Sequence, residues 1–178
     1  MTKRNQILLA ASRIVHKQGV SQLTLEAVAN EAGISKGGLL YHFPNKEALV
    51  QGMLDELLSK YSNEIKQRVE SDDSPSGRWS RAYAEATFHE VESGLEMSSG
   101  LLAAVFTNPE MLEKYQQQYS IWQKQIENDT SDPVLATVIR LVADGLWYSE
   151  IFGLAPLDIN RREQVLTRLL SWTKEEKN

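Results

Sequence analysis

The chain has 178 residues, no cysteine and a formal net charge of −5 at pH 7. The lack of cysteine excludes disulfides, thiolate metal sites and thiol nucleophiles. No stretch approaches the roughly 20 apolar residues of a membrane span, and the early apolar run from Ile7 to Ala11 is too short for a signal peptide. We therefore expect a cytoplasmic chain with no membrane partner.

Positive charge is concentrated in the N-terminal quarter. Residues 1–46 contain six Lys or Arg and two Glu, a net charge of +4, so the remainder carries −9. A DNA-binding module needs local positive charge to displace counterions, even in an acidic protein. This asymmetry favours a basic domain at 1–46 and an acidic one at 47–178. The alternative is that some of these cations only solvate the first helix.

Two helices are predicted before Gly33. Ile7 and Ile14 belong to an apolar stripe at helical spacing, and Gly19 stands where a left-handed cap would end the first helix. Thr24 is the predicted N-cap of a second, shorter helix that stops at Gly33.

The next predicted helix, about Ser35 to Phe43, contains two adjacent glycines. Gly37 and Gly38 each cost about 0.5–1 kcal/mol relative to Ala inside a helix, which suggests that another molecule approaches this backbone closely. Three polar side chains that suit phosphate and sugar oxygens flank them: Lys36, Tyr41 and His42. A short helix, a tight turn and a second short helix over residues 24–43 form a helix-turn-helix, whose second helix enters the major groove. An irregular connector between helices is the alternative.

One continuous segment carries a family resemblance. Residues 24–49 read TLEAVANEAGISKGGLLYHFPNKEAL, which resembles the DNA-binding segment of the tetracycline-repressor (TetR) family of bacterial transcription regulators. The match runs from about residue 2 to 54 and rests on eight positions at the family's spacing: Ala29, Gly33, Ser35, Gly37, Leu39, Phe43, Lys46 and Leu49. One position departs from the family pattern, because Leu40 follows Leu39 and the aromatic residue is delayed to Tyr41. Leu40 either packs inward or touches a thymine methyl group.

The resemblance implies a fold and a set of contacts. The fold is all-α, with an N-terminal three-helix DNA-binding domain and a larger helical domain that binds a small ligand and dimerises. The residues implied to contact a double-stranded DNA operator are Thr24, Ser35, Lys36, Gly37, Gly38, Tyr41, His42 and Lys46. Among them, Gly37 and Gly38 would face base edges and most of the others phosphates.

Every periodic segment beyond residue 46 predicts helix, and none predicts a strand. A fourth helix is expected from Lys46 to about Glu70, followed by a polar loop at 71–77. Two further helices are expected at about 79–93 and 101–106, and a third begins at Asn108-Pro109. The next is expected from Asp132-Pro133 to Gly153. The last has its N-cap at Asn160, with Glu163 three residues later. The total is about nine helices.

Aromatic side chains in the second domain supply material for an effector pocket. The candidate ligand-binding residues are Trp79, Tyr83, Phe88, His89, Phe106, Tyr119, Trp122 and Trp147. An aromatic stripe at helical spacing is more often core than pocket, so core packing is the alternative for each. His89, Gln118 and Asp144 are polar groups among them that could orient a ligand. No charged cluster indicates an acidic effector, which favours a largely apolar or aromatic one.

The last two helices are the most apolar in the chain. By the family resemblance they form a homodimer interface, for which the candidates are Leu135, Ile139, Val142, Leu166 and Leu170. Burial of the same side chains within one subunit is the equal alternative.

Enzymatic function has little support in the sequence. Glu85, His89 and Glu92 share a helical face that could hold a metal, but no second helix offers a matching histidine. Motifs for nucleophilic, metalloprotease or dinucleotide chemistry are absent, so we expect no enzyme, metal or cofactor. The predicted function is a ligand-responsive repressor that binds a roughly palindromic operator as a homodimer. The alternatives are a helical binding module without an operator, or a transcriptional activator.

Overall fold

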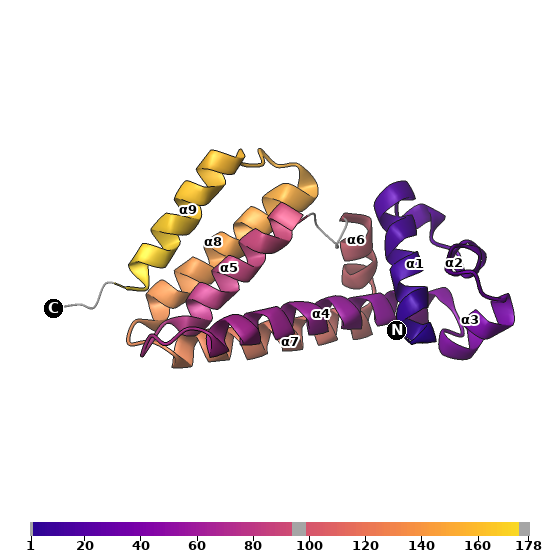
Figure 1. Cartoon of the computed structure of the whole chain (residues 1–178), viewed down its shortest axis with the longest axis horizontal. Coiled ribbons are helices and arrows are strands. Elements are labelled where there is room, and N and C mark those ends of the chain that lie inside the picture. The colour runs from indigo at the N-terminus through magenta and orange to yellow at the C-terminus, as the bar shows by residue number, and fades with distance from the viewer. Residues whose placement is uncertain (1, 94–98, 175–178) are drawn as a thin grey trace. The chain divides into compact units, whose positions relative to one another are not determined.

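The computed structural model describes residues 2–93 and 99–174, with the side chains of 92 and 93 left out. Regular structure in these residues is entirely helical (Figure 1). The helices are α1 (Lys3–Gln18), η1 (Val20–Gln22), α2 (Leu25–Ala32), α3 (Lys36–His42), α4 (Lys46–Glu70), α5 (Arg78–Ser93), α6 (Ser99–Thr107), α7 (Pro109–Asn128), α8 (Pro133–Phe152) and α9 (Ile159–Trp172). The all-α fold predicted from the sequence is therefore confirmed.

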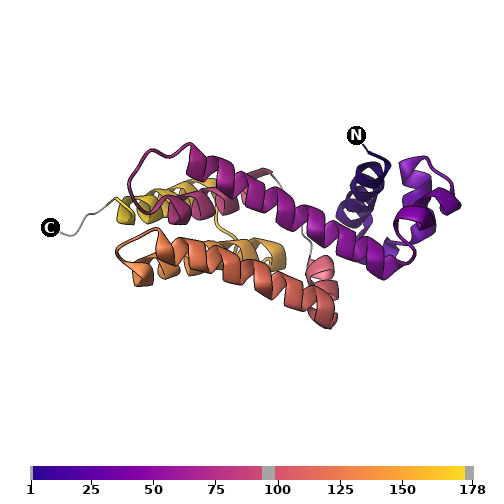
Figure 2. The same ribbon diagram turned by 90° about the horizontal axis from the view of Figure 1, so that it is seen from below.

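The chain divides into two compact units. Unit 1 comprises α1, η1, α2, α3, α4 up to Ser59, α6, and α7 up to Tyr115. Within it, α1 packs against α2, α2 packs against α3, and the three lie together near the N-terminal end of α4 (Figure 2). Unit 2 comprises α4 from Lys60, α5, α7 from Gln116, α8 and α9. The predicted domain division at residue 46 stays a prediction.

Side-chain caps set the helix starts of unit 1. The Thr24 hydroxyl accepts a hydrogen bond from the Ala27 amide at 3.1 Å, and the Ser35 hydroxyl accepts one from the Gly38 amide at 3.1 Å. The Asn45 side chain does the same for α4. Gly33 ends α2 in the left-handed conformation with φ of 65°, where a residue without Cβ is favoured. The predicted N-cap at Thr24 and the predicted end of this helix at Gly33 are confirmed.

The predicted start of the last helix is wrong by two residues. The N-cap of α9 is Asp158, whose carboxylate accepts a hydrogen bond from the Arg161 amide at 2.8 Å, and Asn160 already lies inside the helix. Asp158 caps as well as Asn does, and Arg162 reaches back to the Leu157 carbonyl and to Glu150 of α8. These contacts favour the earlier start.

In unit 2, α5 packs against both α8 and α9. Small side chains let α5 and α8 approach closely, since Ala82 and Ala86 of α5 and Ala136 and Ala143 of α8 are all buried. This contact brings Tyr83 of α5 to α8, where the polar cluster described below forms. Among the described residues, no helix is both long and apolar enough to cross a bilayer.

Candidate nucleic-acid interface and buried polar cluster

Nearly all of the residues predicted to contact DNA are exposed in unit 1. His42 is half-buried and the others are exposed: Thr24, Ser35, Lys36, Gly37, Gly38, Tyr41 and Lys46. Tyr41 is the extreme case, with 86% of its surface accessible. The Tyr41 ring meets the adjacent His42 ring edge to face and is otherwise exposed, so it is available to a partner.

Two buried side chains fix the orientation of α3. Leu39 is fully buried and Phe43 is 3% exposed. The Phe43 ring sits so close to α4 that a Cβ on Gly52 would lie 2.6 Å from its Cε1 atom, and the Arg4 guanidinium lies over the same ring. Leu40, next to Leu39, is exposed. The sequence left open whether Leu40 packs inward, and the structure turns it outward.

The glycine pair of α3 differs in its surroundings. A Cβ placed on Gly37 would meet nothing within 4 Å, whereas one on Gly38 would lie 3.3 Å from the capping hydroxyl of Ser35. Neither glycine has the positive φ that would require the residue. No internal contact therefore explains Gly37.

The cations beside this surface have partners inside unit 1. The Lys36 ammonium lies 2.7 Å from the Glu26 carboxylate of α2, and this hydrogen-bonded partner lowers the pKa of Glu26. The Lys46 ammonium lies 3.5 Å from the Val20 carbonyl oxygen. The Lys36–Glu26 pair is exposed, so a phosphate could replace Glu26 at small cost.

In unit 2, polar groups gather around a buried carboxylate of α8. Asp144 accepts hydrogen bonds from the Tyr83 hydroxyl at 2.6 Å, from the Tyr119 hydroxyl at 3.5 Å, and from the guanidinium of Arg140. Burial raises the pKa of Asp144, while Tyr83 and Arg140 oppose that shift. Burial also raises the pKa of Tyr83 well above its ordinary value. The cluster therefore keeps its hydroxyls protonated.

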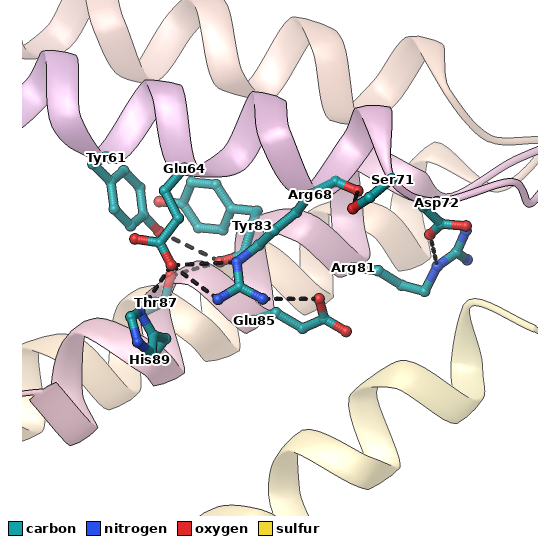
Figure 3. Close-up of polar contacts among 10 residues, drawn as sticks. All are labelled: Tyr61, Glu64, Arg68, Ser71, Asp72, Arg81, Tyr83, Glu85, Thr87 and His89. Atoms are coloured by element: carbon teal, nitrogen blue, oxygen red, sulfur yellow. Dashed lines mark hydrogen bonds and ion pairs between the residues drawn. The ribbon is translucent and has the colours of Figure 1, made fainter.

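Aromatic rings cover this cluster in edge-to-face packing. The Trp122 ring contacts Tyr83, Tyr119 and Tyr61, with centroid distances of 5.9, 5.2 and 5.2 Å. The Tyr61 hydroxyl points to Thr87 and to the Tyr83 carbonyl (Figure 3). The residues predicted from the sequence for this site include neither Tyr61 nor Arg140. The four-residue spacing of Arg140 from Asp144 was the available signal.

A second polar group lies at the surface between α4 and α5 (Figure 3). Glu64 accepts from Arg68 and contacts the Nδ1 atom of His89 at 2.9 Å, while Arg68 also reaches Glu85 at 3.3 Å. Of the side chains considered for a metal, Glu85 is thus paired with Arg68 and His89 is hydrogen-bonded to Glu64. Glu92 lies outside the described side chains, and the described ones contain no group of three or more potential metal ligands.

A third polar group is built on Arg81, which is 5% exposed. Its guanidinium donates to the Asp72 carboxylate at 2.7 Å, to the Ser76 carbonyl at 2.9 Å and to the Thr173 hydroxyl at 3.0 Å. The Arg81 hydrogen bond lowers the pKa of Asp72 to about 2. Arg81 thus ties the loop before α5 and the end of α9 to α5.

The residues predicted to bind an effector are only partly brought together. Tyr83, Tyr119 and Trp122 meet at Asp144. The others are buried (Phe88, Trp147), half-buried (Trp79) or exposed (His89, Phe106). Phe106 lies in unit 1 and packs on Tyr115, whereas the Asp144 cluster belongs to unit 2. Gln118 is half-buried.

The apolar face of α8 is divided between the inside and the outside of unit 2. Ile139 is 1% exposed and belongs to the core. The other residues predicted for a dimer interface are partly accessible: Leu135, Val142, Leu166 and Leu170. The predicted interface did not include Val134, Val138 and Leu141, which are exposed large apolar side chains of α8.

Two family models match the chain. The model described as "Bacterial regulatory proteins, tetR family" matches residues 7–53. The model described as "Tetracyclin repressor-like, C-terminal domain" matches residues 77–174, which is more than half of the chain.

Relatives and solved structures agree with the family models. The HTH-type transcriptional regulator TtgR of Pseudomonas putida is 46% identical over 54 residues, which span 30% of this chain and 26% of TtgR. The HTH-type transcriptional repressor KstR2 of Rhodococcus jostii is 27% identical over 130 residues, spanning 71% of this chain and 51% of KstR2. A TetR transcription regulator from Haloarcula marismortui superposes with a TM-score of 0.78 over 97% of this chain and 96% of its own, at 16% identity, which shows a shared fold.

Proposed function

Because the chain belongs to the TetR family of bacterial transcription regulators, we propose that it is a ligand-responsive repressor of the cytoplasm. It binds a roughly palindromic operator as a homodimer and is released by a small effector in the helical body. The family and the matched relatives are transcription regulators and not enzymes. KstR2, whose name describes a repressor, supports repression over activation.

The observation that carries the DNA-binding proposal is the exposed surface of α3. Gly37 stands in open space without a conformational need for glycine, next to Lys36 and the exposed Tyr41 ring. A backbone without a Cβ lets base edges approach, and the flanking side chains hold phosphates. Buried Leu39 and Phe43 keep this surface in place on unit 1.

The test is selection of binding sites from random duplex DNA, followed by affinity measurement at two salt concentrations. We expect a pseudo-palindromic site whose halves are one or more helical turns of about 34–36 Å apart. Lys36→Ala should weaken binding to all sequences and reduce the salt slope by about 1, because one phosphate contact is lost. Lys124→Ala, an exposed lysine of α7 in unit 2, is the matched control and should change neither. Binding without any sequence preference would reject the repressor function.

The outer face of α8 is the proposed dimer contact. Val134, Val138 and Leu141 are 74%, 40% and 54% exposed, and they recur at helical spacing together with Val142. A Cβ on Gly145, one turn further, would meet nothing within 4 Å, so a second helix can approach the backbone there. A second copy of this chain would bury these groups. Ile139 is not part of this proposal, because its own protomer already buries it.

The dimer is tested by analytical ultracentrifugation of single charge insertions. Leu141→Glu should shift the chain to monomers, because a carboxylate cannot be buried unpaired at the centre of an apolar contact. Ile121→Glu is the matched control, since Ile121 of α7 is equally exposed at 54% but lies outside the α8 face. Equal sedimentation of both variants as dimers would place the interface elsewhere.

Release from DNA requires that the effector bind two arrangements of the chain with different affinity. A structural link exists inside unit 1, where α6 packs against η1, directly before the first helix of the helix-turn-helix. The approach is close, because a Cβ on Gly100 of α6 would lie 2.6 Å from a methyl carbon of Val20. A shift of α6 on effector binding would therefore move η1 and α2. This contact supports α6, together with α4, as the lever of release.

A further inference from the structure

A buried indole nitrogen of unit 2 has no hydrogen-bond partner. Trp147 of α8 is 8% exposed, and its Nε1 atom is buried without an acceptor among the described residues. Buried donors are paired in nearly all native proteins, because an unpaired one keeps the full cost of leaving water. An acceptor from outside the chain would satisfy it.

The polar group one turn earlier on the same face of α8 does not supply that acceptor. The Oδ1 atom of Asp144 accepts from Tyr83 and Tyr119, and its Oδ2 atom accepts from Arg140. The carboxylate is thus held by α5, α7 and α8 at once. Trp147 follows Asp144 by three residues on α8, and both oxygens of that carboxylate already accept hydrogen bonds.

The charges in this interior are balanced. Of the described residues, the buried ones with charge are Asp144, paired with Arg140, and Arg81, paired with Asp72. A charged ligand entering here would lose its hydration without meeting an unpaired opposite charge. An uncharged ligand avoids that penalty.

We propose that the effector is an uncharged, largely aromatic molecule with a carbonyl or similar oxygen that accepts a hydrogen bond from the Trp147 indole N–H. This inference rests on the ligand-responsive function proposed above and specifies the chemistry of its effector.

The test uses four probes with one aromatic skeleton, namely naphthamide, naphthoate, naphthylmethylammonium and naphthalene. Binding to the full chain is measured by calorimetry. We expect naphthamide to bind at least about tenfold more tightly than the anion or the cation, because the interior offers no free counter-charge. Tightest binding of either charged probe, or binding of none of the four, would overturn the proposal.

The hydrogen bond itself is isolated by removing the N–H. Trp147→Phe should weaken naphthamide about fivefold to tenfold and leave naphthalene, which has no acceptor, unchanged. Replacement of Trp147 by its sulfur isostere benzothienylalanine removes the N–H without changing the ring volume, which keeps the test valid if the Phe variant folds poorly. Trp172→Phe in α9 is the control and should affect neither probe. Equal losses for naphthamide and naphthalene would mean that Trp147 only packs.

Failure of this inference differs from failure of the proposed function. Operator selection with the ligand-free chain reports on the function alone, whereas the probe series reports on the interior of unit 2. Naphthamide should also weaken binding to the selected operator in the native chain and do so less in the Trp147→Phe variant.

Discussion

The two units handle their polar side chains in opposite ways. In unit 1, the polar groups of α3 face water, and the space over Gly37 is empty. In unit 2, Arg81 and Asp144 are buried, and each is held by three side chains or backbone groups, of which at least one comes from a distant part of the chain. An exposed polar surface stays hydrated in the free chain, so it costs little free energy and remains available to a partner. A buried polar group must be paired to avoid the cost of leaving water, and the Trp147 indole N–H is one of five buried side-chain polar atoms in the described part of unit 2 that have no partner.

The largest expected effect is loss of the buried arginine in unit 2. Arg81→Ala removes the guanidinium that joins Asp72, Ser76 and Thr173, and it should lower the free energy of unfolding by about 3–5 kcal/mol. Urea unfolding monitored by circular dichroism measures the change. Arg168→Ala removes an exposed arginine of α9 and should cost less than about 0.5 kcal/mol. Similar losses of unfolding free energy in both variants would contradict the contrast between buried and exposed polar groups.

The next effect is a pH dependence of the free energy of unfolding, which arises from Asp72, the carboxylate partner of Arg81. The pKa of Asp72 is about 2 in the folded chain and 3.8 ordinarily, so the unfolded chain binds the proton first. Ionised Asp72 therefore contributes its full stabilisation at pH values well above 3.8. This stabilisation, about 2 kcal/mol, disappears as the pH falls to the pKa of Asp72 in the folded chain. Unfolding at a series of acidic pH values measures it. Asp72→Asn should flatten this part of the profile, whereas Asp73→Asn, at an exposed neighbouring position, should leave it unchanged.

In unit 1 we expect one substitution, Gly37→Ala, to raise stability and to weaken operator binding. Gly37→Ala places a methyl group in open space on a helix, so it should raise the free energy of unfolding by about 0.5–1 kcal/mol. The same methyl group should weaken operator binding about tenfold, because base edges then cannot approach the backbone. Thermal unfolding and gel-shift titration measure the two effects.

A variant with both higher stability and full operator affinity would show that Gly37 does not face DNA. Gly38→Ala is a poorer probe, because the new methyl group would press on the Ser35 hydroxyl that caps α3.

The contrast also explains what the sequence could predict. The cap at Thr24, the end of α2 at Gly33 and the extent of α4 follow from residues close together in the chain, and the structure confirms them. The Asp144 cluster joins residues up to 61 positions apart, so no local pattern could reveal that Tyr83 donates to it. Phe106 shows the same limit, since helical periodicity marked it as aromatic and apolar but could not assign it to unit 1.

The smallest effect concerns Glu26, an acidic side chain of α2 that contacts Lys36 of the proposed operator surface. Glu26 holds the Lys36 ammonium at 2.7 Å, and both groups are exposed. Glu26→Gln removes a negative charge that would repel phosphates and frees Lys36, so binding to random duplex DNA should tighten severalfold at low salt. The gain should vanish at high salt and be nearly equal for operator and scrambled DNA, because a phosphate contact carries no sequence information. Glu31→Gln, which frees Arg13 in the same way at a position on the other side of α2, is the matched control. If Glu26→Gln instead lowers affinity for the operator alone, Glu26 is a positioning residue that aims Lys36 at a base, and the outward surface of unit 1 is more preorganised than its open geometry indicates.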